Sequence, residues 1–344
     1  MQAILGLPIG SIIDRIGVRR SLATACLLTG LGAWSMSIAG NLAAAIAAMA
    51  LIGLGYAFVN PATSKGVLEW VPAKRRATGM GIKQSGVPIG GILGATIGAL
   101  LVYADWRHLL YLVTAATALV LIPCLFLPAG RTAETRWSWR QMARDLRIVL
   151  LDRNLGWYNL GIGIYQVGQF SLFAYVTLFM REALQASQPL AAACLGIAQT
   201  ASAAGRLSWG VLSDFAFGGR RKPVQVAVGC LAATSLVLLI VARPGWGLWL
   251  AVGLTAVAGL SVAGHVALSQ TIVVENTERS LAATAIGYNR ILTGLGGMIG
   301  PPLFGLTVDM TGGYRSGWLL TAAIVLAGTL IIAFRFREKA KVAG

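Results

Sequence analysis

Four basic side chains lie within long apolar stretches of the sequence: Lys65, Lys83, Arg206 and Arg290. A charge in apolar surroundings is costly, so residues of this kind often belong to a binding or transfer site. Lys83-Gln84 and Asn289-Arg290 occupy matching places in the two halves of the chain, and an anion would neutralise both cations. We therefore predict that Lys83, Gln84, Asn289 and Arg290 bind an anionic small molecule. The alternative is that both cations extend out of the apolar region to water.

Three further ionisable features have structural as well as chemical interpretations. Lys65 and Glu69 are four residues apart, the spacing at which opposite charges pair on one helix face. Arg206 precedes Asp214 by about two helical turns, and we expect it to brace the loop that follows. His265 could bind the solute or carry a proton, or it could form a hydrogen-bonded contact between helices.

The stretches that hold these residues are long enough to cross a membrane. The chain has 344 residues, of which 56% are hydrophobic and 12% charged, a balance typical of membrane proteins. A helix needs roughly 20 mostly apolar residues to span the hydrocarbon core. Ten runs have about this length: 21–39, 42–70, 78–103, 107–127, 155–179, 190–213, 223–241, 246–274, 283–308 and 316–334. An eleventh run, 1–13, is shorter, and its uncharged start disfavours a signal peptide, so we expect the chain to begin inside a helix.

The basic residues predict the orientation of these helices. When the runs are threaded in order, twenty Lys and Arg residues fall in the connections on one side and four in those on the other. Positively charged loops stay in the cytoplasm. We therefore expect an integral protein of the plasma membrane, a bacterial inner membrane, with its C-terminus cytoplasmic. The net charge of +16 reflects this topology, and we expect no nucleic-acid partner, which would need the charges on one soluble face.

Residues suited to catalysis or metal binding are not grouped in the sequence. The four cysteines stand singly, without a CxxC pair or a histidine at ligand spacing. The sequence also contains no phosphate-binding loop of the GxxxxGK[ST] type, no nucleophile elbow and no converging pair of carboxylates. We expect no enzyme activity, no cofactor and no metal.

One long polar connection, residues 129–154, divides the chain. Within it Trp139, Met142, Leu146 and Val149 recur at helical spacing with arginines between them. This pattern predicts a short amphipathic helix on the cytoplasmic membrane surface; a solvated linker is the alternative. We therefore predict three parts, listed here in chain order: an incomplete N-terminal helical bundle at 1–128, the linker at 129–154 and a C-terminal six-helix bundle at 155–344.

The two bundles share a sequence plan, which indicates an internal repeat. A shift of 200 residues places Gly10 on Gly210 and Asp14 on Asp214, with a basic cluster after each aspartate. A shift of 206 residues places ATGMGIKQ, residues 77–84, on ATAIGYNR. If each repeat has six helices, the C-terminal bundle is complete and the N-terminal bundle lacks its first helix.

Glycines spaced four residues apart also occur in both halves. They are Gly86, Gly90, Gly94 and Gly98 in the first half, and Gly296 and Gly300 in the second. A stripe of small residues lets helix backbones approach closely in a membrane. We predict that both stripes are helix-packing faces.

The motif that begins at Gly10 resembles the signature loop of the major facilitator superfamily of transporters, G-x-x-x-D-R/K-x-G-R-R/K. The first copy has one additional residue before its final basic pair, and the second copy is partial. The first comprises Gly10, Asp14, Arg15, Gly17, Arg19 and Arg20, and the second comprises Gly210, Asp214, Gly219, Arg220 and Arg221. The resemblance implies an all-α membrane protein of two pseudo-symmetric six-helix bundles around a central cavity. Here it would have eleven transmembrane segments, with the first helix missing and the second partial.

The chemistry of this loop favours a gate. A carboxylate at the cytoplasmic end of a helix can form charge pairs that hold one conformation closed and break in another. We predict that the gate is formed by Asp14, Arg15, Arg19, Arg206, Asp214 and Arg220. The alternative is that these charges only fix membrane orientation, which is sufficient for Arg19 but does not account for the aspartates.

These features predict a secondary active transporter that moves a small organic anion, such as a carboxylate, by alternating access in symport with protons. We expect it to act as a monomer in the lipid bilayer. One alternative is efflux of several drugs or of cationic solutes, which would need a carboxylate deep in the membrane. Another is an inactive truncated product.

Overall fold

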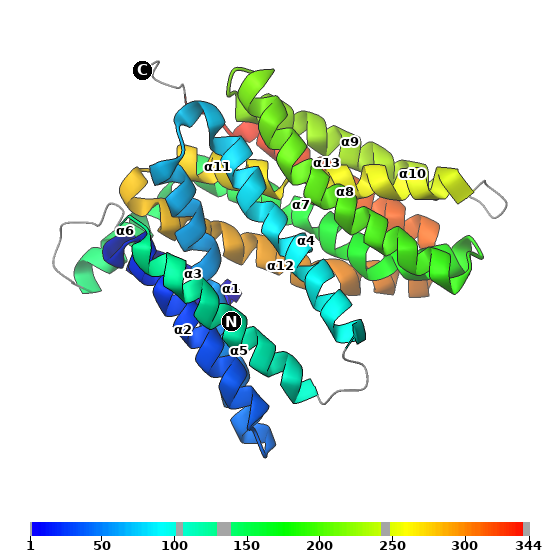
Figure 1. The fold of residues 1–344 in the computed structure, drawn as a ribbon. Coiled ribbons are helices and arrows are strands. Elements are labelled where there is room, and N and C mark those ends of the chain that lie inside the picture. The colour runs from blue at the N-terminus through cyan, green and yellow to red at the C-terminus, as the bar shows by residue number, and fades with distance from the viewer. Residues whose placement is uncertain (1, 101–105, 129–138, 242–247, 340–344) are drawn as a thin grey trace. The chain divides into compact units, whose positions relative to one another are not determined.

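The computed structural model describes residues 2–100, 106–128, 139–241 and 248–339. All regular elements among these residues are helical, which confirms the predicted all-α fold (Figure 1). The α-helices are α1 (Gln2–Ile16), α2 (Val18–Ser37), α3 (Leu42–Trp70), α4 (Arg76–Leu100), α5 (Trp106–Phe126), α6 (Trp139–Leu151), α7 (Arg153–Leu178), α8 (Gln188–Phe215), α9 (Arg221–Val241), α10 (Leu248–Ala258), α11 (Val266–Glu275), α12 (Ala282–Thr311) and α13 (Tyr314–Arg335). Short 3₁₀ turns precede α4, at Ala73–Arg75, and α12, at Arg279–Leu281.

The helices follow the predicted membrane spans closely. α3 coincides with the predicted run 42–70. Within the described residues, seven helical stretches are long and apolar enough to cross a membrane by length and composition. α1 is a helix of 15 residues, shorter than the roughly 20 residues that a complete span requires.

The run predicted at 246–274 is interrupted, which the sequence did not indicate. A π-helical turn at Gly259–Ala263 separates α10 from α11. Here the backbone lies against α8: a Cβ atom on Gly259 would overlap the carbonyl group of Ala198. Such a turn inserts one residue into the helical repeat and bends the helix.

The chain forms two compact units. Unit 1 comprises Met1–Val71, Ile89–Asp152 and Val273–Ile291, and unit 2 comprises Pro72–Pro88, Arg153–Ile272 and Leu292–Gly344. α4 therefore begins in unit 2 and continues in unit 1, whereas α12 begins in unit 1 and continues in unit 2. The sequence did not indicate that α4 and α12 are each divided between the two units. The domain boundaries predicted at 1–128, 129–154 and 155–344 stay a prediction.

In unit 1, α2 packs along both α3 and α5 (Figure 1). Small residues permit this close packing, since a Cβ atom on Gly55 would lie 2.9 Å from the carbonyl oxygen of Ala25. α3 begins after Asn41, whose side-chain oxygen accepts a hydrogen bond from the backbone N–H of Ala44 at 2.8 Å. α1 lies against α3, and Ile13 and Phe58 belong to the buried apolar core.

In unit 2, α13 packs against α7 and α9, and α8 packs against α10 and the π-helical turn (Figure 1). The predicted glycine stripe of α12 lies against α7. A Cβ atom on Gly296 would overlap the carbonyl group of Gly163, and one on Gly300 would lie 2.8 Å from the carbonyl oxygen of Val167. These contacts confirm the predicted packing role for the α12 stripe. The same prediction is wrong for Gly86 and Gly90 of the α4 stripe, where a Cβ atom would meet no atom within 4 Å.

α6 forms the helix predicted within the linker. Val149 is buried and Leu146 is half-buried, while Arg144 and Arg147 are exposed. α6 contacts α1. Residues 129–138 of the predicted linker lie outside the described residues, as do the side chains of Trp139 and Met142. The predicted membrane-surface location of α6 stays a prediction.

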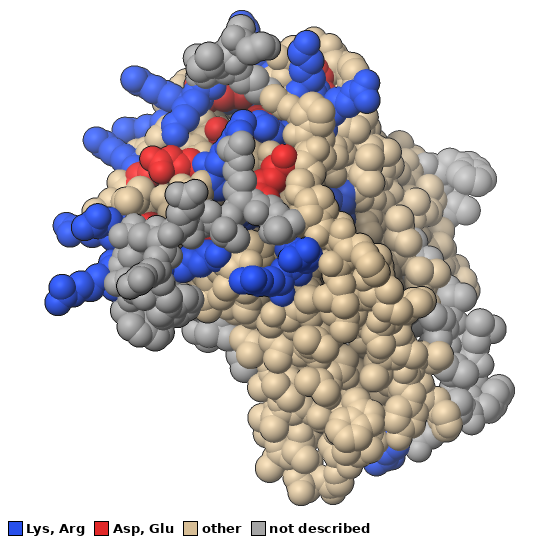
Figure 2. Space-filling view, turned by 60° about the vertical axis from the view of Figure 1, so that its left-hand side comes forward, with Lys and Arg blue, Asp and Glu red and all other residues tan. Residues whose placement is uncertain are grey.

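Charged side chains are unevenly distributed on the surface. Figure 2 shows the blue Lys and Arg side chains, together with the red Asp and Glu side chains, concentrated on one part of the visible face. A broad tan area beside them carries almost no charge. Many large apolar residues are exposed on the helices, among them Leu31 and Ile46 in unit 1 and Leu330 in unit 2. This pattern suits a protein whose sides contact lipid.

Candidate functional site

The carboxylate of Asp14, near the end of α1, binds the first turn of α12. It accepts hydrogen bonds from the backbone N–H groups of Ala283 (3.1 Å) and Thr284 (2.9 Å), and from the Thr284 hydroxyl (2.8 Å). N–H groups in the first turn of a helix have no carbonyl partner within that helix, and the helix dipole favours an anion there. Because Asp14 is only 4% exposed, water competes little for this contact.

A buried lysine from α3 completes this contact. The Lys65 ammonium lies 3.1 Å from an Asp14 carboxylate oxygen and donates a hydrogen bond to the Asp14 carbonyl oxygen at 3.0 Å. It also lies 3.9 Å from Glu69, so the pair predicted from helical spacing is present. The shorter contact with Asp14 was missed, because a spacing rule within one helix cannot indicate a partner 51 residues away.

The second copy of the motif forms the equivalent contact in unit 2. Asp214, at the end of α8, accepts hydrogen bonds from the backbone N–H (2.8 Å) and the hydroxyl (2.7 Å) of Thr78, in the first turn of α4. Its other carboxylate oxygen pairs with the guanidinium of Arg221, at the start of α9. Both charged side chains of this pair are fully buried, so each depends on the other for neutralisation.

Two glycines allow these helix ends to meet. A Cβ atom on Gly10 would lie 2.5 Å from the carbonyl oxygen of Ala283, and one on Gly210 would overlap the carbonyl oxygen of Ala77. The two repeats found in the sequence are thus joined crosswise: each copy of the motif contacts the repeated segment from the other half of the chain.

Glycines also end the helices that carry the two aspartates. Gly17, with φ of 81°, separates α1 from α2, and Gly218 and Gly219, with φ of 56° and 79°, lie between α8 and α9. Side chains disfavour this left-handed backbone conformation, whereas glycine adopts it freely. The motif glycines therefore set the turns that leave Asp14 and Asp214 at helix ends.

The basic residues predicted for the gate have different surroundings. Arg15 pairs with Asp145 of α6 at 3.2 Å, and Arg19 is half-buried in the first turn of α2. Arg220 is exposed, whereas its neighbour Arg221 is fully buried and pairs with Asp214. Sequence reasoning selected Arg220 for this role because two adjacent arginines look equivalent until the turn fixes which one points inward.

The predicted residues Lys83 and Gln84 lie near Arg206 and α11 in unit 2. The Arg206 guanidinium donates a hydrogen bond to the Gln84 carbonyl oxygen at 2.9 Å, and both residues are buried. Lys83 is half-buried and donates to the side-chain oxygen of Gln270 at 2.9 Å. The acceptor of this bond is the amide oxygen of a neutral side chain. Gln270 was not among the residues predicted to bind the solute.

His265 lies in the same unit, just after the π-helical turn. It is 1% exposed, and its Nδ1 atom lies 3.0 Å from the carbonyl oxygen of Val262. Its ring packs against Tyr165 with ring centroids 4.3 Å apart. The hydrogen bond is therefore local, and the contact with another helix is the ring packing on Tyr165 of α7; neither tests a role in proton transfer.

Asn289 and Arg290 lie on α12 in unit 1. Asn289 is 3% exposed, and Arg290 is half-buried. Arg290 interacts electrostatically with Tyr56 of α3. Asn289 is thus buried and Arg290 is partly accessible, and their predicted role in solute binding stays a prediction.

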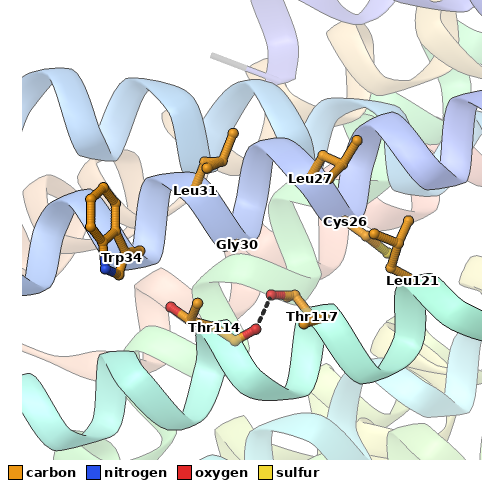
Figure 3. Close-up of a pocket in the computed structure, with 9 residues that line it drawn as sticks. Cys26, Leu27, Gly30, Leu31, Trp34, Thr114, Thr117 and Leu121 are labelled. Carbon is orange, nitrogen blue, oxygen red and sulfur yellow. Dashed lines mark hydrogen bonds between the residues drawn. The ribbon is translucent and has the colours of Figure 1, made fainter.

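Unit 1 also contains an apolar cavity of about 210 Å³ between α2 and α5 (Figure 3). It is lined by Cys26, Leu27, Gly30, Leu31, Trp34, Thr114, Thr117, Ala118 and Leu121. The Thr117 hydroxyl donates to the carbonyl oxygen of Thr114 at 2.8 Å, shown as the dashed line in Figure 3. None of the predicted solute-binding residues lines this cavity, and its lining offers no charge for an anion.

Comparisons with known proteins agree with this architecture. The family model described as Major Facilitator Superfamily matches residues 1–255 and 160–344. Monocarboxylate transporter 13 of Rattus norvegicus is 26% identical, over 95% of this chain and 76% of the relative. Multidrug resistance protein MdtG of Yersinia enterocolitica is 26% identical, over 93% of this chain and 77% of the relative.

The fold is also similar to that of solved transporters. The fucose:proton symporter of E. coli superposes with a TM-score of 0.81, over 97% of this chain and 88% of that one, at 17% sequence identity. Family match, relatives and fold agree along the whole length of the chain and confirm the resemblance carried by the two loops. The chain belongs to the major facilitator superfamily.

Proposed function

We propose that this transporter moves a small organic anion, with a carboxylate as the recognised group, by alternating access. The observation that carries the proposal is the Lys83 ammonium, a half-buried cation within an apolar helix that donates a hydrogen bond to the side-chain oxygen of Gln270 at 2.9 Å. The identity of 26% to a monocarboxylate transporter over 95% of the chain supports the same solute class.

In this proposal, each unit contributes solute-binding residues. In unit 2 these are Lys83, Gln84 and His265, and in unit 1 they are Asn289 and Arg290. A carboxylate recognised by ammonium and guanidinium groups receives charge-assisted hydrogen bonds, which are shorter and stronger than neutral ones. We assign the coupling proton to His265, because an imidazole ring can both accept and release a proton.

The gate is proposed to consist of the two aspartate contacts. α4 and α12 each contribute residues to both units, so a change of transport state has to act on these helices. Asp14 and Asp214 bind the first turns of α12 and α4, and release of these turns would break charge-assisted bonds that hold one state closed. Arg15 and Arg19 in unit 1, and Arg206 and Arg220 in unit 2, are proposed to contribute to the gate.

We further propose that the protein is a monomer in a bacterial inner membrane, with the C-terminus in the cytoplasm. The excess of basic residues in the connections on one side of the predicted spans supports this orientation. Efflux of drugs or cationic solutes is the competing function, because multidrug resistance protein MdtG is equally similar, at 26% identity.

Thermal unfolding of the detergent-purified protein distinguishes the two functions. Lactate, pyruvate and benzoate serve as anionic probes, and ethidium and tetraphenylphosphonium as cationic ones. A bound ligand raises the unfolding temperature in proportion to the logarithm of its concentration. We expect stabilisation by one of the anions, and loss of that effect in Arg290→Ala. Stabilisation by the cations, unchanged in Arg290→Ala, would overturn the anion proposal and favour efflux.

A further inference from the structure

A second cavity, this one polar, lies in unit 2, and none of the residues proposed to bind the solute lines it. It has a volume of about 450 Å³ and is formed by the start of α7 and the end of α13. The residues that line it are Arg153, Asn154, Trp157, Phe334, Arg335 and Arg337. Three guanidinium groups and an indole ring therefore surround one space.

The backbone after α13 is fixed in place at this cavity. Asn154 donates a hydrogen bond from its side-chain nitrogen to the Arg337 carbonyl oxygen and accepts one from the Arg337 backbone N–H, each at 2.8 Å. Phe336, between Arg335 and Arg337 in the chain, is fully buried, and the centroid of its ring lies 4.9 Å from that of Tyr158. The arginines on either side of Phe336 are thus held at the cavity by an ordered segment.

Two acids lie next to the cavity arginines in the chain, Asp152 before Arg153 and Glu338 after Arg337, and Glu338 is engaged elsewhere. Glu338 accepts hydrogen bonds from the backbone N–H groups of Arg221 (2.7 Å) and Lys222 (3.1 Å) at the start of α9. Arg335 lies over the ring of Trp157, 5.1 Å from its centroid. Among the described residues, no carboxylate forms an ion pair with Arg153, Arg335 or Arg337. The cavity therefore gathers positive charge that an anion would neutralise.

We propose that this cavity binds the phosphate group of an anionic phospholipid headgroup. Guanidinium groups match the geometry of phosphate oxygens and bind them with paired hydrogen bonds. Basic pockets between membrane helices at the cytoplasmic end are suited to such headgroups. A volume of about 450 Å³ accommodates a group larger than a single ion.

An exposed apolar stripe on α13, which ends at the cavity, favours a lipid over free phosphate as the ligand. Leu326, Leu330 and Phe334 follow one another at four-residue spacing on α13, and they are 40%, 44% and 80% exposed. Residues at this spacing lie on one helix face, so the stripe leads directly to Arg335. An acyl chain along the stripe and a phosphate among the arginines would satisfy both surfaces together.

Lipid binding can be measured without any transport assay. The detergent-purified chain is heated with added dioleoylphosphatidylglycerol, with dioleoylphosphatidylcholine or with sodium phosphate, and native mass spectrometry counts the lipids retained. The test variant Arg153→Gln/Arg337→Gln removes two cavity charges. The matched control Arg20→Gln/Arg75→Gln removes two exposed charges outside the cavity.

We expect phosphatidylglycerol to raise the unfolding temperature of the wild type and the control by at least about 3 °C, with one lipid retained. The test variant should lose most of this shift, and Arg153→Lys/Arg337→Lys should recover part of it. An equal shift in the test variant would overturn the site. An equal shift with phosphatidylcholine or with sodium phosphate alone would overturn the assignment to an anionic lipid. If the test variant does not purify folded, the single variant Arg337→Gln is compared with Arg20→Gln in the same way.

Discussion

Asp14 and Asp214 stand in the same relation to the helices they bind, although they lie in different halves of the chain. Each carboxylate accepts the backbone N–H and the hydroxyl of a threonine in the first turn of a helix from the other half, Thr284 of α12 and Thr78 of α4. Each also pairs with a fully buried cation, Lys65 or Arg221. The repeat therefore preserves the function of the carboxylate as a helix cap, while the cation comes from a different place in the fold.

Removal of the Asp14 charge should destabilise the protein. In Asp14→Asn the buried Lys65 ammonium, now 3.1 Å from that carboxylate, keeps its hydrogen bond to the backbone carbonyl of residue 14 but loses its nearer carboxylate, so that Glu69 at 3.9 Å is the carboxylate left beside it. Removing one partner of a buried ion pair costs about 3–5 kcal/mol. We expect a lower unfolding temperature in detergent and loss of transport in proteoliposomes.

The double variant Asp14→Asn/Lys65→Met distinguishes the role of this ion pair in gating from its role in stability. It removes both charges, so we expect it to recover much of the stability but none of the gating. Equal stability of Asp14→Asn and the wild type would show that the ion pair is not a structural element.

Arg221 and Arg220 should differ sharply despite being neighbours. Arg221→Gln leaves the buried Asp214 carboxylate without its charged partner, whereas Arg220 is exposed. We expect Arg221→Gln to lose about 3–5 kcal/mol of stability, and Arg220→Gln to change it by less than about 0.5 kcal/mol. Thermal unfolding of both variants side by side makes the comparison. Similar losses in the two would contradict the geometry of the turn.

Glycine at position 10 should be required for the approach of α1 to α12. A Cβ atom there would lie 2.5 Å from the carbonyl oxygen of Ala283, so Gly10→Ala forces the two helices apart. Overpacking of this kind costs about 1–3 kcal/mol. Gly40→Ala is the control, because a Cβ atom at Gly40 meets no atom within 4 Å. Both are measured by thermal unfolding, and an unchanged Gly10→Ala protein would refute the close contact.

The Lys83 charge should determine affinity for the anion. In Lys83→Gln we expect the KM for an anionic substrate to rise about 10-fold to 100-fold, because a charge-assisted hydrogen bond is lost. Lys83→Arg, which keeps the charge, should retain most of the affinity. Initial uptake rates in proteoliposomes measure both. If Lys83→Gln keeps the wild-type KM, the ammonium of Lys83 does not bind the solute.

His265 should link proton movement to solute movement. In His265→Gln we expect solute-driven alkalinisation of the medium to disappear, while exchange of labelled for unlabelled solute continues. A pH-sensitive dye and a counterflow assay report the two processes separately. Should proton uptake persist in this variant, the role of His265 would be structural, through its local hydrogen bond to Val262 and its ring packing on Tyr165.

The sequence by itself determined that the chain is a membrane protein of this family, since the apolar runs and the motifs that show it are local features of the sequence. Apolar runs of sufficient length specify membrane helices whatever their neighbours, and α3 begins and ends at the predicted residues. The paired motifs around Asp14 and Asp214 and the two repeat shifts were readable because the repeat preserves residue type and order.

Only the tertiary structure decided which residues meet. The contact between Lys65 and Asp14 spans 51 positions, the one between Asp14 and Thr284 spans 270, and no periodicity within a helix encodes either. The choice of Arg221 over Arg220 depends on a turn of two glycines with positive φ. The arginine cavity arises because Asn154 fixes Arg337 from 183 residues away. Local spacing fixes which face of a helix a side chain occupies, but packing alone selects the partner opposite that face.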